Sequence, residues 1–281
     1  MHGAHESVDA LLDHPDVVGI SFVGSSATAR GVYARAAAAG KRVQALGGAK
    51  NHMIVLPDAT LDPTIDALLG SLFGSTGQRC LAGSVVIGVG DAYEPLRDRF
   101  VERAASLRVG CGFDDDTDMG PVVSKKHLER VLRFIDQGEA EGARMVLDGR
   151  GARAQRYPAG QFVGATVFEN VKPTMRLGSE EIFGPVASLR RVKSLDEAVA
   201  LMHDVEYGNA TSIFTASGRA AREFRYGAGI SMIGINIGVA APMAMFPFGG
   251  SRASFFGDLK VQGSDAVSFY TDRRVVISRW G

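Results

Sequence analysis

Cys80, one of two cysteines in the chain, lies in the segment FGSTGQRCLAGS (residues 73–84), directly after Arg79. A thiol attacks carbonyl carbon when it is ionised, and a neighbouring guanidinium or backbone N–H group favours ionisation. The surrounding glycines let backbone amides approach a bound substrate closely. The segment therefore suits acyl chemistry at Cys80, although a lone cysteine among small residues is also a common core filler. Cys111, in RVGCGFDDD, has no such context and is expected to be structural.

Two further segments are compatible with cofactor binding. In FVGSSATARG (residues 22–31) a strand ends in Gly-Ser before a helix, and the N–H groups at such a helix start can hold a phosphate. Its spacing is not the G-x-G-x-x-G of the standard dinucleotide turn. In SEEIFGPV (residues 179–186) a carboxylate in a turn could accept hydrogen bonds from ribose hydroxyls. Taken singly, each segment favours a purely structural turn over a binding site.

The elements that must position these segments alternate along the chain. Short apolar runs predict strands at 17–24, 41–46, 52–58 and 84–89. Helical spacing and capping residues predict helices at 25–40, 62–71, 93–107, 124–143 and 194–202. This alternation indicates an α/β fold with mostly parallel sheets. The tail AVSFYTDRRVVISRW (residues 266–280) is expected to form a strand pair or one long strand.

Composition excludes several classes of protein. The 281 residues include 31 basic and 31 acidic residues, so the net charge is zero and gives no indication of nucleic acid or an anionic membrane as partner. Two cysteines cannot form a disulfide framework, which favours the reducing cytoplasm. The sequence contains neither a secretory signal nor an apolar run long enough to span a membrane. No metal site is expected.

Six segments occur in the order and spacing of the aldehyde dehydrogenase superfamily: ISFVGSSATARG, ALGGAKNHMIVLPDA, FGSTGQRC, SEEIFGPV, YGNATSIFT and FPFGGSRASFFGD. The chain resembles this superfamily over essentially its whole length. GAKNH, GQRC, SFFGD and FYTDRRVV make it similar to the CoA-acylating methylmalonate-semialdehyde dehydrogenase branch. The resemblance implies an aldehyde dehydrogenase-like α/β fold, with a C-terminal catalytic domain and a partial Rossmann-type cofactor domain.

The resemblance also implies roles for individual residues. Cys80 would attack the aldehyde carbonyl and, after hydride transfer to NAD, carry a thioester. Arg79 would bind the carboxylate of a small semialdehyde substrate. Four residues are implied to contact NAD: Ser25 at its phosphates, Gly47 beside the nicotinamide, Glu181 at the nicotinamide ribose, and Phe183 packing next to it.

Ala45 departs from most aldehyde dehydrogenases, which place an acid before LGG as the general base for hydrolysis. The CoA-acylating branch lacks that acid too, because coenzyme A takes the acyl group. The resemblance therefore implies coenzyme A as co-substrate and an acyl-CoA product. With malonate or methylmalonate semialdehyde, loss of CO2 would give acetyl-CoA or propionyl-CoA.

Relative to the superfamily, the chain starts near the middle of the cofactor domain and lacks the asparagine that helps to stabilise the oxyanion. The expected organisation is a remnant of the NAD-binding domain (1–47), a catalytic domain (48–253), a return segment (254–270) and an oligomerisation strand (271–281) that implies a homo-oligomer. Two alternatives stay open: a non-catalytic remnant that folds or pairs with full-length subunits, and a thiol acyltransferase or thioesterase. Strands left without neighbours would favour association and weak NAD binding.

Overall fold

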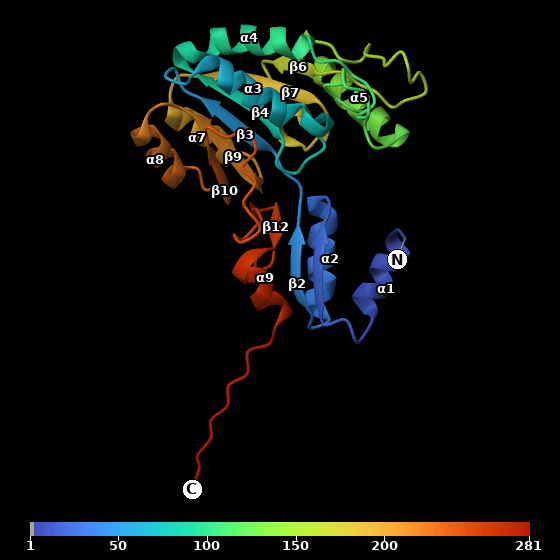
Figure 1. The fold of residues 1–281 in the computed structure, drawn as a ribbon, viewed down its shortest axis with the longest axis vertical. Coiled ribbons are helices and arrows are strands. Elements are labelled where there is room, and N and C mark those ends of the chain that lie inside the picture. Colours follow the sequence, from blue (N-terminus) through green and yellow to red (C-terminus); the bar gives the residue numbers. More distant parts are fainter. Residues whose placement is uncertain (1–2) are drawn as a thin grey trace. The chain divides into compact units, whose positions relative to one another are not determined.

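A computed structural model describes residues 3–281, and the chain divides into two units (Figure 1). One unit comprises residues 48–240, and the other combines residues 1–47 with residues 241–281. Each unit has its own sheet and its own buried apolar side chains. No helix within residues 3–281 is both long and apolar enough to cross a membrane.

The larger unit is built on a seven-stranded sheet of order β10-β9-β3-β4-β7-β6-β5. All neighbouring pairs are parallel except β5–β6, which is antiparallel. The strands are β3 (Asn51–Val55), β4 (Gly83–Val89), β5 (Arg144–Leu147), β6 (Thr166–Glu169), β7 (Val186–Val192), β9 (Ala210–Phe214) and β10 (Met232–Ile235). Because the six strands from β10 to β6 all run the same way, their amino ends share one edge of the sheet and their carboxyl ends share the other.

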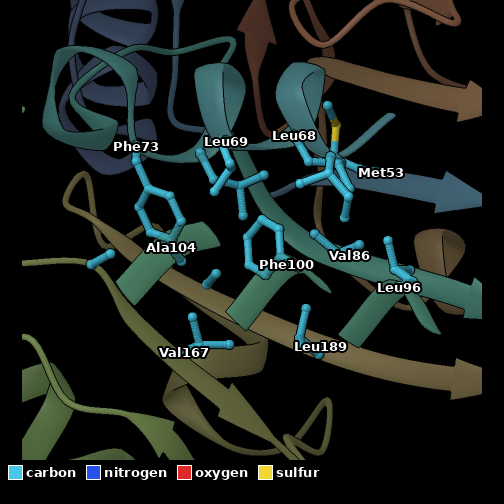
Figure 2. Close-up of a cluster of buried hydrophobic side chains, with 14 of the residues drawn as sticks. Met53, Leu68, Leu69, Phe73, Val86, Leu96, Phe100, Ala104, Val167 and Leu189 are labelled. Atoms are coloured by element: carbon cyan, nitrogen blue, oxygen red, sulfur yellow. The ribbon is translucent and has the colours of Figure 1, made fainter. Parts of the chain in front are cut away.

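Helices cover both faces of this sheet. The α3 (Leu61–Leu72) and α4 (Tyr93–Ala105) helices pack on one face, where the rings of Phe73 and Phe100 stack 5.7 Å apart in an apolar cluster that also contains Val86 (Figure 2). The α7 (Leu195–His203) and α8 (Gly218–Gly227) helices pack on the other face, against Ile54 and Ile87. Side chains that alternate along β3 and β4 therefore enter two separate apolar clusters, as expected for strands buried on both sides.

The larger unit has five further elements. They are the short helical turns η1 (Gly74–Gly77) and η2 (Gly90–Ala92), the helices α5 (Lys125–Ala140) and α6 (Arg176–Ser179), and the two-residue strand β8 (Tyr207–Gly208). A third apolar cluster joins α5 to β6 through Ile135, Phe168 and Leu177.

The smaller unit has a three-stranded sheet of order β1-β2-β12. Its elements are α1 (His5–Asp13), β1 (Gly19–Val23), α2 (Ser26–Ala38), β2 (Arg42–Leu46), β11 (Ser251–Arg252), β12 (Phe255–Phe256) and α9 (Gly263–Tyr270). The β1 and β2 strands are parallel, and β12 is antiparallel to β2. A small core joins α1 and α2 through Leu12, Val32 and Ala36. Along the edge strand β1, Val23 is 67% exposed, and Val18 just before it is 76% exposed.

The predicted alternation of strands and helices and the mostly parallel sheets are confirmed, with shifts of a few residues at element ends. The α3 helix begins one residue before the predicted start at Asp62, with Thr60 as its N-cap residue. The strand predicted for the tail is wrong over residues 266–270, whereas the oligomerisation strand expected at 271–281, which needs a second subunit, stays a prediction. Residues 263–270 form α9, which buries Phe269 and is steadied by the Asp265 carboxylate accepting from the Lys260 N–H at 3.0 Å. Residues 271–281 form neither helix nor strand.

Candidate active site

The loop that carries Cys80 joins the end of α3 to the start of β4, at the amino edge of the larger sheet. Three successive residues, Ser75, Thr76 and Gly77, have positive φ angles of 52°, 56° and 67°. This conformation is uncommon for a β-branched residue such as Thr76 and persists only where surrounding contacts enforce it. One such contact is the Thr76 hydroxyl, which donates to the Gly120 carbonyl at 2.9 Å. The left-handed turn therefore fixes the path of the chain just before the thiol.

The Cys80 loop packs directly against the backbone of the SEEIFGPV segment. A Cβ atom on Gly77 would lie 2.7 Å from the carbonyl carbon of Gly184, closer than side-chain carbons come to such atoms. Position 77 therefore requires glycine for two reasons: its positive φ angle and the close contact with the Gly184 backbone. Two segments about 100 residues apart in sequence are consequently held in contact.

Two buried amides hold the Cys80 carbonyl. The side-chain nitrogens of Asn51 and Asn209 donate to it at 2.8 Å and 2.7 Å. The Asn51 amide also donates to the Ala82 carbonyl at 2.8 Å and accepts from the Ala210 N–H at 3.0 Å, which ties β3 to β4 and β9. Both asparagines are positioning residues that sequence reasoning missed. Their signal was present in GAKNH and YGNATSIFT, but nothing in those segments assigns them a partner.

The Cys80 thiol is half-buried, and burial raises its pKa above the ordinary cysteine value. The Glu181 carboxylate raises it further, while the backbone N–H groups of Cys80 and Leu81 and the charge of Arg79 oppose the shift. Sequence reasoning anticipated activation by Arg79 and the backbone, but burial outweighs both. The thiol is therefore mostly protonated near neutral pH and needs a change of surroundings or a base to react.

Arg79 points back along the chain toward the end of α3. Its guanidinium donates to the Gly70 carbonyl and, at 3.2 Å, to the Ser71 carbonyl, where it serves as a C-terminal cap. The Nε atom of Arg79 is buried and has no hydrogen-bond partner among the described residues. Binding a substrate carboxylate, as predicted for Arg79, would thus require the guanidinium to give up its contacts to α3 or to share them.

Glu181 lies against the Gly48–Ala49 backbone, and a Cβ atom on Gly48 would come within 2.7 Å of its Oε2 atom. Burial raises the pKa of Glu181 to about 6, although the Ala49 N–H and the charges of Arg130 and Lys50 work against this. Lys50 is only 4% exposed and donates to the Glu180 carbonyl at 2.9 Å, and burial lowers its pKa to about 8. A partly desolvated carboxylate therefore sits within electrostatic reach of the Cys80 thiol.

The α5 helix holds the segment that carries Glu181 and Phe183. Arg130 donates to the carbonyls of Ile182 at 2.5 Å and Glu181 at 2.8 Å, and His127 Nε2 bonds the Phe183 carbonyl at 2.7 Å. Phe183 has a φ of 61°, and its side chain is 37% exposed. His127 and Arg130 were not singled out from the sequence. They keep an aromatic ring in a strained, exposed position, which suits a surface that a planar ligand covers.

The remaining predicted cofactor residues, Ser25 and Gly47, belong to the smaller unit. The Ser25 hydroxyl caps α2 by accepting from the Thr28 N–H at 3.3 Å. A Cβ atom on Gly47 would lie 2.7 Å from the Ser26 hydroxyl oxygen, so Gly47 adjoins the start of α2. Ala45 is fully buried in β2, between Phe22 of β1 and Phe256 of β12. Cys80, Arg79, Glu181 and Phe183 belong to the larger unit.

Comparison with known proteins identifies the family. The sequence profile of the aldehyde dehydrogenase family matches residues 1–276. The chain belongs to the aldehyde dehydrogenase family. The resemblance inferred from the sequence and the expected fold class are thereby confirmed.

Several relatives of this aldehyde dehydrogenase chain act on small semialdehydes. It is 46% identical over 280 residues to the malonate-semialdehyde dehydrogenase of Halalkalibacterium halodurans, and 48% identical to malonate-semialdehyde dehydrogenase 1 of Geobacillus kaustophilus. In both comparisons the whole chain is covered, but only 57% of the relative. The chain therefore spans little more than half the length of these curated relatives.

Solved structures agree with this placement. The methylmalonate-semialdehyde dehydrogenase of Oceanimonas doudoroffii matches with a TM-score of 0.97 and 46% identity, over 99% of this chain and 57% of that one. A Sinorhizobium meliloti protein assigned to the same group of enzymes and solved with NAD matches with a TM-score of 0.97 and 45% identity, with the same coverage of both chains. A point mutant of the betaine aldehyde dehydrogenase of Staphylococcus aureus, solved with NAD+, matches with a TM-score of 0.89 and 28% identity, over 93% of this chain and 53% of that one.

The described residues offer no metal centre, because no three His, Cys, Asp or Glu side chains among them gather closely enough to hold an ion. The groups that the candidate active site brings together are a thiol, Cys80, and a carboxylate, Glu181.

Proposed function

We propose that this chain supplies the thiol and the acyl-transfer site of an NAD-dependent, CoA-acylating dehydrogenase of malonate or methylmalonate semialdehyde. The observation that carries the proposal is the position of Cys80 at the amino edge of the sheet: two buried amides bind its backbone carbonyl, and its thiol lies within electrostatic reach of Glu181. The similarity to malonate-semialdehyde dehydrogenases supports the choice of substrate class.

The chemistry at Cys80 follows from a thiolate meeting an aldehyde. The ionised sulfur adds to the carbonyl carbon, and the oxygen takes up a proton to give a thiohemiacetal. Loss of a hydride from that carbon and of the hydroxyl proton leaves a thioester on Cys80. NAD, when bound, supplies the acceptor for the hydride.

The second half of the reaction releases the acyl group. A carboxylate next to the thioester leaves as CO2, and its bonding electrons stay on the α carbon, which takes a proton from water. The thiolate of coenzyme A then attacks the thioester carbon, and the Cys80 thiolate leaves. Ala45 favours this acceptor over water, because it provides no carboxylate to activate a water molecule.

The residues present suit a dinucleotide cofactor. The N–H groups at the start of α2, next to Ser25, and the helix dipole favour phosphate. Gly47 packs so closely against the start of α2 that a side chain there would displace the Ser26 hydroxyl next to the phosphate-binding N–H groups. The Glu181 carboxylate can accept hydrogen bonds from hydroxyl groups, and the exposed Phe183 ring offers an apolar surface. These residues would hold NAD, and Arg79 would bind the substrate carboxylate if its guanidinium turns from α3.

Steady-state assays of the purified chain test this function. NADH formation from malonate semialdehyde should rise several-fold with coenzyme A, and the product should be acetyl-CoA. Cys80→Ser should abolish the rate, whereas Cys111→Ser should leave it intact. Arg79→Leu should reduce activity on malonate semialdehyde far more than on propanal. A rate indifferent to coenzyme A, or a free acid as main product, would contradict the proposal.

The exposed edge strand β1 favours a second role, that of a non-catalytic subunit pairing with full-length relatives or with itself. Its edge is unpaired within the described residues, and Val18 and Val23 are largely exposed. This role predicts weak NAD binding by calorimetry and large particles by light scattering. A monodisperse monomer that binds NAD at micromolar affinity would rule it out.

A further inference from the structure

Three consecutive residues at the start of β3 contact both parts of the candidate active site. The Ala49 N–H bonds the Glu181 carboxylate, and the Asn51 amide donates to the Cys80 carbonyl at 2.8 Å. Lys50 lies between these two residues in the chain, and its side chain also reaches the segment that carries Glu181. This short stretch therefore links that segment to the Cys80 loop.

Lys50 carries a buried ammonium group. It is only 4% exposed, and its Nζ atom donates to the Glu180 carbonyl at 2.9 Å. An ammonium has three N–H donors and a full positive charge, and burying it without a nearby counter-charge is costly. Burial accordingly lowers the pKa of Lys50 to about 8, while the charges of Glu181 and Glu180 oppose the shift. The ammonium is thus still charged at neutral pH.

Glu181 is the carboxylate available to balance this charge. The Glu180 carboxylate is already paired with the Arg176 guanidinium at 2.5 Å. Glu181 has no cation at ion-pair distance among residues 3–281; burial raises its pKa to about 6, and the charges of Arg130 and Lys50 work against that rise. Lys50 and Glu181 are therefore two buried opposite charges that act on each other without forming an ion pair.

The other basic groups around Lys50 are bound to backbone or uncharged. Arg130 and His127 of α5 bind the carbonyls of residues 181–183. His52 is buried, and burial and the charge of Lys50 lower its pKa to about 3, so it is neutral above pH 4. Because α5 keeps the segment anchored when Lys50 is replaced, such a replacement removes chiefly its charge.

We propose that Lys50 is a positioning residue, which anchors the backbone beside Glu181 and supplies positive charge that keeps Glu181 ionised at neutral pH. An ionised carboxylate only accepts hydrogen bonds, whereas a protonated one uses one oxygen as a donor and suits ribose hydroxyls less well. The benefit for NAD binding rests on the proposed function. The coupling between Lys50 and Glu181 does not depend on it.

Unfolding free energies of the purified chain between pH 4 and pH 9 test the coupling. The difference between the parent and Glu181→Gln contains the contribution of Glu181, which falls as the pH rises and levels off above its pKa of about 6. In a Lys50→Met background this levelling should occur about one pH unit higher, because a nearby opposite charge lowers a carboxyl pKa by roughly one unit or more. Lys50→Arg, which keeps the charge, should return it toward pH 6.

The matched control is Lys193→Met, which removes an exposed ammonium just after β7, whereas Glu181 lies before that strand. It should leave the levelling near pH 6. Lys50→Gln keeps an N–H donor without the charge, so it should act like Lys50→Met and replaces that variant if methionine prevents folding. The inference is overturned if the uncharged Lys50 variants change stability equally at every pH, or if Lys193→Met shifts the profile as much.

A second readout is the KM for NAD. Lys50→Met should raise it about threefold at pH 6.5, where a one-unit shift moves Glu181 from mostly ionised to mostly protonated. The effect should disappear at pH 9, where the parent Lys50 is itself uncharged. An equal rise in KM at both pH values would contradict the inference. If the parent shows no NAD-dependent rate, the proposed function fails, while the pH profile of stability still decides the coupling.

Discussion

Gly77 and Gly184 meet backbone to backbone, with no room for a side chain on Gly77 between them. This contact joins the Cys80 loop to the segment that carries Glu181 and Phe183. Gly77→Ala should therefore separate the two segments and strain a residue with a φ of 67°. We expect a loss of about 1–3 kcal/mol in the free energy of unfolding, measured by urea denaturation, and altered alkylation of Cys80.

The matched control for that variant is Gly142→Ala. Gly142 also has a positive φ, of 90°, but a Cβ atom there would meet nothing within 4 Å. It should cost stability through its φ angle alone and leave the Cys80 alkylation rate unchanged. Equal effects of the two variants on that rate would show that the glycine contact does not position the thiol.

The two asparagine amides on the Cys80 carbonyl should differ in how much stability they contribute. Asn209→Ala removes one of the two amide donors, and the carbonyl keeps the hydrogen bond from Asn51, so the free energy of unfolding should fall by about 1–2 kcal/mol. Asn51→Ala also leaves Ala82 and Ala210 without their partners and should cost about 3 kcal/mol or more. Chemical denaturation measures both values. A smaller loss for Asn51→Ala than for Asn209→Ala would refute this division.

The pH dependence of Cys80 alkylation follows from its raised pKa. Only the thiolate reacts with iodoacetamide, and the pKa of Cys80 lies above the ordinary cysteine value of about 8.5. In a Cys111→Ser background the alkylation rate should therefore keep rising with pH above about 8.5. Glu181→Gln removes a negative charge that opposes ionisation and should shift the midpoint downward. Glu180→Gln, whose side chain pairs instead with Arg176, should leave it unchanged. A midpoint below that of free cysteine would be inconsistent with burial as the dominant effect.

Glu181 should also make the stability of the fold depend on pH. Its pKa is about 6 in the fold against about 4.5 ordinarily, so the folded state holds the proton more tightly. The resulting stabilisation is complete below pH 4.5 and is lost as the pH rises through 6. The rise of about 1.5 pKa units corresponds to a loss of about 2 kcal/mol in the free energy of unfolding between low and neutral pH, at 1.36 kcal/mol per pKa unit. Unfolding free energies of the parent and Glu181→Gln at pH 4 and pH 7 measure it, and parallel pH profiles for the two would exclude Glu181 as the source.

Local sequence determined much of the fold. The Ser194 hydroxyl caps α7 by accepting from the Glu197 N–H, as the spacing of the two residues predicts. Alternating strands and helices were also readable, because burial on both faces leaves continuous apolar runs in β3 and β4. The prediction failed at the start of the tail because the i, i+2 spacing of Val267 and Phe269 is that of a strand, whereas the helix buries Phe269 and leaves Val267 65% exposed.

The nucleophile of the site was predictable from the sequence, but the residues that position it were not. Asn51 and Asn209 lie 29 and 129 residues from Cys80, and no local pattern predicts contacts across such separations. The direction of the Cys80 pKa shift depends on burial by distant segments, whereas the sequence displays only the neighbouring Arg79. The orientation of Arg79 likewise depends on where α3 ends.

The central claim, that Cys80 passes an acyl group to coenzyme A, can be measured without the redox step. The purified chain is incubated with propionyl-CoA, and intact mass spectrometry with peptide mapping follows the acyl group. The account predicts a thioester on Cys80, its absence in Cys80→Ser, and much faster release by added coenzyme A than by water. Failure of Cys80 to be acylated, equal acylation of Cys111, or loss to water as fast as to coenzyme A would contradict it.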